Sequence, residues 1–243
     1  MIADYGNYAY VTRIPTEVVY PGTVNQTEEM RRAIELEFSA FEKALYSYDY
    51  DSKEYGYTQW IDTPSFVDYF IINEFTCNYD AGELSTYIYK DVSGKYKICV
   101  WDFNNACDNY MEARIHLHDF DTQNRLLYHM LCRDEDFMEA IIARYKELRR
   151  GVLSEEYLMD YIDRTVAYLG PAIDRNFDKW GYSFQPEYNR LKGEDREICS
   201  YDEAIRQLRE FLIERGNWMD QNIDALREFS AESAVKKYNE NAD

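Results

Sequence analysis

The chain has 243 residues, of which 46% are hydrophobic and 16% aromatic, and this content excludes a largely disordered polypeptide. Acidic side chains outnumber basic ones by 46 to 27, and the resulting net charge of −19 disfavours binding to nucleic-acid phosphates. No apolar run approaches the roughly 18 residues of a membrane span, and the first residues lack a signal-peptide pattern. Five cysteines without a CxxC pair, together with three histidines, predict no zinc site.

The first part of the chain predicts two amphipathic helices separated by a polar, tyrosine-rich loop over residues 48–57. In residues 25–47, apolar side chains recur every three or four positions, and Asn25 with Glu28 resembles a capping box. A second helix is expected to start with Thr63 as its N-cap and Pro64 in its first position, and to end near Asn78.

The middle of the chain predicts a β-hairpin, and the remainder predicts helices. Residues 85–91 and 95–101 are short runs rich in β-branched and aromatic residues around a Val-Ser-Gly turn. Helices are then expected over residues 121–132, 135–150, 154–169, 171–180 and 201–228. The sequence therefore predicts a mainly α, α+β fold in a single domain over residues 1–243, with a frayed tail over 231–243.

The helical periodicity also predicts which side chains form the core. The expected core residues are Phe38, Phe41, Phe66, Phe70, Leu126, Met130, Ile141, Tyr145, Leu158, Ile162, Leu208, Leu212 and Trp218.

Carboxylates, amides and one hydroxyl lie at the two ends of the predicted hairpin. The set comprises Asn78, Asp80, Ser85, Asp102, Asn104, Asn105 and Asp108. Because an antiparallel hairpin returns the chain to its starting point, we expect the residues around Asp80 to meet those around Asp102. Oxygen ligands of this kind suit Mg²⁺ or Mn²⁺. The same residue types also terminate strands and close turns, so a purely structural role stays open.

Protein kinases place a catalytic Asp before, and a metal-binding Asp after, a comparable segment. By this parallel Asp80 is the catalytic carboxylate and Asp102 the metal ligand, and Ser85 stands where the catalytic loop has an Asn. Asn104 stands where the Asp-Phe-Gly motif has its Gly, and Asn is the residue that best replaces Gly in a left-handed conformation.

Residues 61–110 resemble the core signature of the spore-coat protein H (CotH) kinase family. The similarity lies in a helix that ends in Asn-Glu-Phe, in the Asn-Tyr-Asp step at 78–80, in the strand Tyr-Ile-Tyr-Lys-Asp, and in Trp-Asp-Phe-Asn at 101–104. Residues 8–60 and the later helices fit more loosely, including Arg-Gly-Asn-Trp-Met at 215–219.

The resemblance implies an atypical bacterial protein kinase of the spore coat or cell surface. It implies the fold of the C-terminal kinase lobe, the cofactors ATP and Mg²⁺ (or Mn²⁺), and phosphoryl transfer to Ser or Thr of a basic protein substrate. It also places Glu74 near the site. The implied assignments are catalytic roles for Asp80 and Asn78, cofactor binding by Ser85 and Asn105, and metal binding by Asp102, Asn104 and Asp108.

Two departures from the family pattern keep other functions open. Asn104 replaces the second Asp of the family's Trp-Asp-Phe-Asp, and Ser85 replaces the expected Asn. Each change weakens metal binding. The alternatives to a kinase are therefore a non-catalytic interaction module of a spore coat or cell surface, and a structural metal site.

Residues 1–60 contain no glycine-rich loop and no well-placed lysine. We therefore expect an isolated C-terminal lobe, or a short relative, that is inactive alone. The surface left by the missing lobe, near Tyr5–Val11 and residues 55–60, is expected to support a homodimer. Cys77 and Cys107 flank the candidate site, either as buried thiols or as a disulfide.

Overall fold

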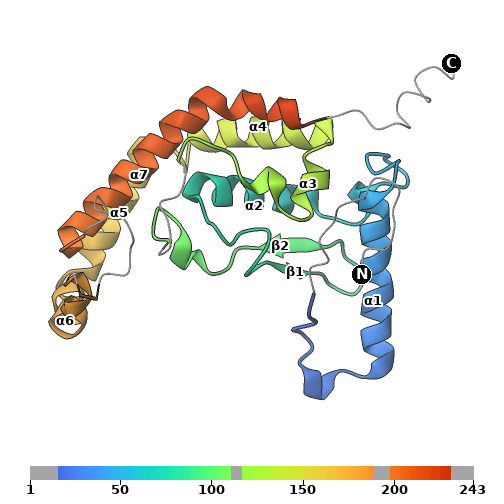
Figure 1. Cartoon of the computed structure of the whole chain (residues 1–243), viewed down its shortest axis with the longest axis horizontal. Helices are drawn as coiled ribbons and strands as arrows, with labels where there is room; N and C mark the ends of the chain where they lie inside the picture. The colour runs from blue at the N-terminus through green and yellow to red at the C-terminus, as the bar shows by residue number, and fades with distance from the viewer. Residues whose placement is uncertain (1–15, 111–116, 186, 189–197, 231–243) are drawn as a thin grey trace.

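The computed structural model describes residues 16–110, 117–185, 187–188 and 198–230 (Figure 1). The fold is mainly helical with one small antiparallel sheet, which confirms the predicted α+β class. In chain order the elements are α1 Glu28–Tyr46, α2 Thr63–Thr76, β1 Tyr87–Tyr89, β2 Lys97–Cys99, α3 Tyr128–Leu131, α4 Glu135–Arg149, α5 Glu155–Leu169, α6 Pro171–Trp180 and α7 Tyr201–Asn222.

The first two helices form where the sequence predicts them, but each has a different cap. The Thr27 hydroxyl accepts a hydrogen bond from the Met30 N–H at 3.1 Å, so the expected capping role of Asn25 is wrong. The Asp62 carboxylate caps α2 by accepting from the Ser65 N–H at 3.1 Å, one residue before the expected cap. Both caps satisfy an N–H group that lacks a partner in the first turn.

Helix α2 forms the centre of the core, between the hairpin and α4 (Figure 1). Most of its side chains are buried, so α2 is apolar around most of its circumference rather than on one stripe. Tyr128 of α3 packs against Phe66 and Phe70 and donates a hydrogen bond to the Phe66 carbonyl at 2.8 Å. The buried position of α2 fixes its C-terminal end, which leads directly into the polar residues 77–80.

The hairpin is confirmed, with Tyr87 paired to Cys99 and Tyr89 paired to Lys97. Ile61 forms a bridge to Tyr96, and the Ile98 N–H donates to the Ser65 hydroxyl at 3.4 Å. These contacts attach the hairpin to the start of α2, so the strands are held against the core although each has only three residues.

The predicted helix over 121–132 is wrong for most of its length. A 3-10 turn covers Thr122–Asn124, Leu126 takes a positive φ of 30°, and only Tyr128–Leu131 is α-helical. The N–H groups of Asp121 and Thr122 donate to the Glu74 carboxylate instead, so this segment is held by α2. The partly exposed Leu126 is accordingly not a core residue.

Helices α5 and α6, with the N-terminal part of α7, form an arm on one side of the core, and the C-terminal part of α7 packs on the core (Figure 1). Ser154 and Ser200 cap α5 and α7, as the sequence predicts. The prediction of buried core residues in α5 and α7 is confirmed for Ile162 and Leu212, whereas Leu158, Leu208 and Trp218 are half-buried. Phe38 of α1 is also half-buried.

An ion-pair network joins α7 to α4. Arg149 donates to the Asp220 carboxylate at 2.9 and 2.7 Å, and the Tyr145 hydroxyl donates to it at 2.8 Å. Burial acts to raise the pKa of Asp220, but these hydrogen bonds outweigh it and lower the pKa below its usual value.

The apolar surface expected around residues 55–60 is present only in part. Tyr57 is buried and donates to the Asp134 carboxylate at 2.6 Å, while Tyr55 is exposed. Tyr5–Val11 and the tail over 231–243 lie outside the described residues. Within the described ranges, no helix has both the length and the apolarity needed to cross a bilayer.

Candidate functional site

The site begins where α2 ends, at a left-handed residue. Cys77 has a φ of 47° and turns the chain out of the helix. The Asn78 N–H then donates to the Asn73 carbonyl at 3.0 Å, and its amide nitrogen donates to the Asn73 Oδ1, also at 3.0 Å. Asn78 is therefore fixed against α2 and is 7% exposed. Its Oδ1 accepts no hydrogen bond from any residue that the structure describes.

The hairpin brings the segment around Asp80 to the segment around Asp102. The Asn105 amide donates to the Asp80 Oδ2 at 2.7 Å, across 25 positions of sequence. The Ser85 hydroxyl lies 3.5 Å from the Asp102 Oδ2, at the limit of a hydrogen bond. Four of the seven residues singled out from the sequence thus pair across the two ends of the hairpin.

Two further contacts join the same segments. The Cys107 N–H donates to the Thr76 carbonyl at 2.7 Å. The rings of Tyr79 and Tyr110 stack with centroids 4.2 Å apart. The two ends of the candidate site are therefore connected by backbone, side-chain and aromatic contacts together.

Left-handed residues are concentrated at this site. Among the described residues, six that are not glycine have a positive φ, and five of them lie between positions 77 and 108. They are Cys77, Ser85, Asp102, Cys107 and Asp108. Such conformations cost on the order of 1–3 kcal/mol each and occur at functional sites, where the surrounding structure holds them in place. This concentration supports a functional role for the site.

The structure does not place Asn104 and Asp108 as the sequence suggests. The left-handed residue of the Asp-Phe-Asn sequence is Asp102, not Asn104, so the expected glycine-like role of Asn104 is wrong. Asn104 belongs to a 3-10 turn, Phe103–Asn105, and its amide donates to the Asn105 Oδ1 at 3.3 Å. Asp108 is 3% exposed, whereas Asp102 is exposed, so their carboxylates lie in different environments.

A buried ion pair between Glu74 of α2 and Arg215 of α7 lies next to the site in the structure. Arg215 of α7 donates to the Glu74 Oε2 at 2.8 Å and to the Glu74 carbonyl at 3.0 Å, and both side chains are almost fully buried. Arg215 also donates to the carbonyls of Leu117 and Asp119. One guanidinium therefore fixes the end of α2, α7 and the segment that begins at residue 117.

The Glu74 carboxylate is held by several donors. Its Oε1 accepts from the N–H groups of Asp121, at 2.9 Å, and Thr122. Burial raises the pKa of Glu74, while Arg215 and these N–H groups act in the opposite direction. Because both Glu74 carboxylate oxygens accept hydrogen bonds within the protein, Glu74 positions the chain beside the site.

The carboxylate of Asp102 suits a metal ion that takes its other ligands from water and phosphate oxygens. Among the described residues there is no group of three His, Cys, Asp or Glu side chains that could enclose an ion. Mg²⁺ usually binds proteins through one or two carboxylates and takes its other ligands from water and substrate phosphates. Asp102 caps the 3-10 turn without using its side chain, so its exposed carboxylate remains available for such a role.

A comparison with models of protein families identifies the family of this chain. The family model described as CotH kinase protein matches residues 16–219, which include both halves of the site and most of α7. The chain belongs to the CotH kinase family. At the level of its family, this CotH protein is therefore a kinase. A comparison with curated proteins finds no match.

The buried Glu74–Arg215 pair and the left-handed residues are features of the candidate site that the sequence did not predict. Arg215 stands in the Arg-Gly-Asn-Trp-Met sequence, which carries a loose family similarity, but its partner lies 141 positions earlier. None of the five cysteines forms a disulfide within the described residues, and Cys77 and Cys107 lie beside the site as separate thiols. Burial raises the pKa of both of these thiols to about 12, so they stay protonated and react slowly with oxidants.

Proposed function

We propose that this CotH kinase transfers the terminal phosphoryl group of Mg²⁺–ATP to a Ser or Thr hydroxyl of a protein. The observation that carries the proposal is the pairing of Asp80 with Asn105 and of Ser85 with Asp102, together with the family match. In kinases, catalysis rests mainly on positioning and on electrostatic stabilisation, and both need fixed carboxylates.

Asp80 is proposed to position the acceptor hydroxyl. Asn105 donates to its Oδ2, and no described residue donates to its Oδ1, which leaves that oxygen to accept a hydrogen bond from the substrate. A carboxylate held on one side in this way keeps a defined orientation for the hydroxyl. Asn78, which is buried against α2, supports the turn that carries Asp80.

Asp102 is proposed to hold the metal, with Asn104 beside it as a weaker oxygen ligand. The metal would neutralise charge on the phosphate oxygens when Mg²⁺–ATP is bound. Ser85 contacts Asp102 and is proposed to keep its carboxylate oriented. Asp108, which is buried, is proposed to shape the turn rather than to bind the ion directly.

The test is phosphate transfer from radiolabelled ATP to a basic, serine-containing peptide, with the natural protein in its full length. Asp80→Asn and Asp102→Asn should each abolish most of the transfer. Asp91→Asn, at the exposed tip of the hairpin, is the matched control and should leave it unchanged. Unchanged transfer by both site variants would refute the assignments.

Asn104 and Ser85 also favour a second candidate, a non-catalytic interaction module of a spore coat or cell surface. In that case the full-length protein should show no transfer, and an Asp80→Asn/Asp102→Asn variant should bind its partner as the wild type does. The correspondence of the fold to a kinase C-terminal lobe, and a homodimer of such lobes, remain proposals. Sedimentation analysis tests the dimer.

A further inference from the structure

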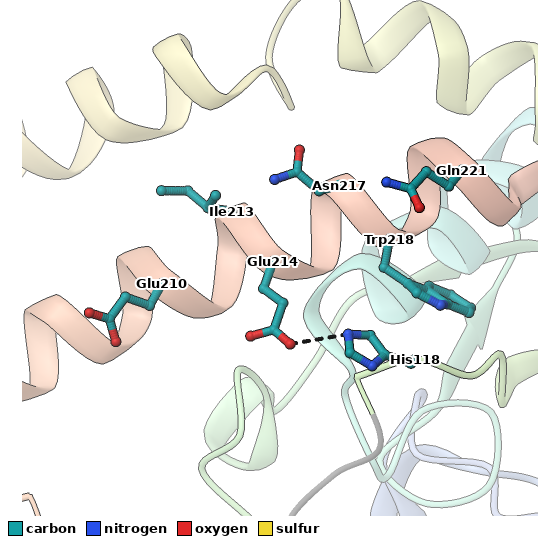
Figure 2. A pocket seen from close by; sticks show the side chains of 7 residues that line it. All are labelled: His118, Glu210, Ile213, Glu214, Asn217, Trp218 and Gln221. Atoms are coloured by element: carbon teal, nitrogen blue, oxygen red, sulfur yellow. Dashed lines mark ion pairs between the residues drawn. The ribbon is translucent and has the colours of Figure 1, made fainter.

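A pocket of about 610 Å³ lies along α7, and none of the candidate catalytic carboxylates lines it. Its walls include Glu210, Glu214, Asn217 and Trp218 of α7, with His118 from the segment below the helix. Figure 2 shows the side chains of Glu210, Glu214 and Trp218 on the side of α7 that faces His118. Their spacing of four residues places them on one helix face.

The aromatic end of this pocket is rigid. The Trp218 ring packs against Phe120, with centroids 4.8 Å apart, and lies near His118 at 6.2 Å. The Arg215 guanidinium lies 4.7 Å from the Trp218 centroid and is itself held by Glu74. Arg215 and Phe120 therefore hold the ring in place, and the part of Trp218 that lines the pocket is a fixed aromatic surface against which a planar group can pack.

The acidic side of the pocket has no strong cation of its own. No Lys or Arg lines it, and within the described ranges Glu210 forms no ion pair. The Glu214 carboxylate lies 3.1 Å from the His118 Nε2. In contrast, Arg209, on another face of the same helix, pairs with Asp163. The pocket therefore combines two carboxylates with a fixed indole ring.

We propose that this pocket binds an arginine side chain in a basic segment of the protein substrate. A guanidinium is planar, carries a permanent positive charge, and can both pair with carboxylates and stack on an indole ring. Asn217 adds an amide at the rim. The proposal rests on the proposed function, because it assigns part of substrate recognition to the same protein.

Hydrogen bonds connect the helix that carries the pocket to the helix that precedes the candidate catalytic site. Arg215, next to Glu214 in sequence, hydrogen-bonds Glu74 of α2 and the carbonyls of Leu117 and Asp119, which flank His118. Six residues after Glu74 the chain reaches Asp80. A substrate segment held in the pocket is thus held by elements that hydrogen bonds connect to the helix preceding the proposed catalytic turn.

The test is the binding of a fluorescein-labelled peptide that contains two arginines and a serine, measured by anisotropy without ATP. A matched peptide has norleucine in place of both arginines. The protein is the 243-residue chain, and because no ATP is present the anisotropy reports binding alone. Glu210→Gln/Glu214→Gln removes the two carboxylates, and Glu35→Gln/Glu228→Gln, at exposed positions elsewhere, makes the same change in net charge.

We expect the pocket variant to bind the arginine peptide about tenfold more weakly, since two partly exposed ion pairs contribute roughly this factor together. The control variant should bind the arginine peptide within about twofold of the parent protein. The parent protein should bind the norleucine peptide no more tightly than the pocket variant binds the arginine peptide. Melting temperatures should agree among all variants, because every substituted side chain is exposed.

Three results would overturn the inference. They are equal binding by the pocket variant, equal weakening in the control, which would show a general charge effect, and equal affinity for the norleucine peptide, which would show an apolar groove. The outcome is separate from that of the proposed function. Arginine-dependent binding at the pocket by a protein that transfers no phosphate would support the pocket and reject the kinase activity.

Discussion

Removal of the buried cation at Arg215 should destabilise the fold more than any exposed charge substitution. Arg215→Met keeps the volume of the side-chain stem but leaves the Glu74 carboxylate buried with only its two backbone donors. The carbonyls of Leu117 and Asp119 lose their donor as well. Breaking a buried ion pair on one side costs about 3–5 kcal/mol, because an uncompensated charge remains in the interior.

This loss is large compared with the whole stability of a domain, which is about 5–15 kcal/mol. Urea unfolding, followed by circular dichroism, should show a midpoint lowered by more than about 1 M. Arg227→Met is the matched control, since Arg227 pairs with Glu139 and Asp224 at the surface. Its unfolding midpoint should change far less than that of Arg215→Met, because solvent screens exposed pairs.

A second variant keeps the reasoning open to refutation if Arg215→Met does not fold. Arg215→Lys retains the charge but loses the planar fork that reaches Glu74 and the two carbonyls together, so its midpoint should fall between the other two. Equal midpoints for Arg215→Met and Arg227→Met would show that the buried pair does not hold α2, α7 and the 117–122 segment together.

Three other outcomes follow from particular contacts. Gly82 has a φ of +78° and a Cβ there would lie 2.8 Å from the Arg125 Cβ, so Gly82→Ala should lower the unfolding free energy by about 1 kcal/mol or more, while Gly94→Ala, with ordinary contacts, should not; equal unfolding midpoints would contradict this. Asp220→Asn should be less stable near neutral pH by less than about 1 kcal/mol, because the side chain is partly exposed. The lowered pKa of Asp220 means that the ionised form stabilises the fold at higher pH and that this contribution is lost as pH falls through the folded value, so the difference should shrink below about pH 4; a constant difference in acid would refute it. All five thiols should react in the denatured, unreduced protein, and a lower count would reveal a disulfide.

The parts that the sequence predicts well are local. The hairpin joins strands only a few residues apart, so the meeting of the Asp80 and Asp102 segments follows from one turn and its register. The caps Ser154 and Ser200 are likewise recognised from the residues beside them. In each case the decisive contact lies within about 25 residues of sequence.

The parts that the sequence did not predict depend on distant partners or on backbone torsions. Residues 121–132 have helical periodicity, but Glu74 captures two of their N–H groups and Leu126 breaks the helix. The pairing of Glu74 with Arg215 joins residues 141 positions apart, which no periodicity reports. The left-handed conformation at Asp102 rather than at Asn104 is set by the turn as a whole, so residue preferences alone misplace it.

The hairpin also acts as a ruler for the candidate site. A slip of one residue in the pairing of β1 with β2 would displace the segment that carries Asp80 relative to the one that carries Asp102 by about 3.3 Å. The tip over residues 91–94, in contrast, lies beyond the last paired residues, Tyr89 and Lys97, and is exposed. Loops at such positions accept insertions readily. A fluorophore-binding tag or a short affinity peptide placed at this tip would therefore leave the spacing of Asp80 and Asp102 intact, which makes the hairpin tip a natural attachment point for labelling this kinase.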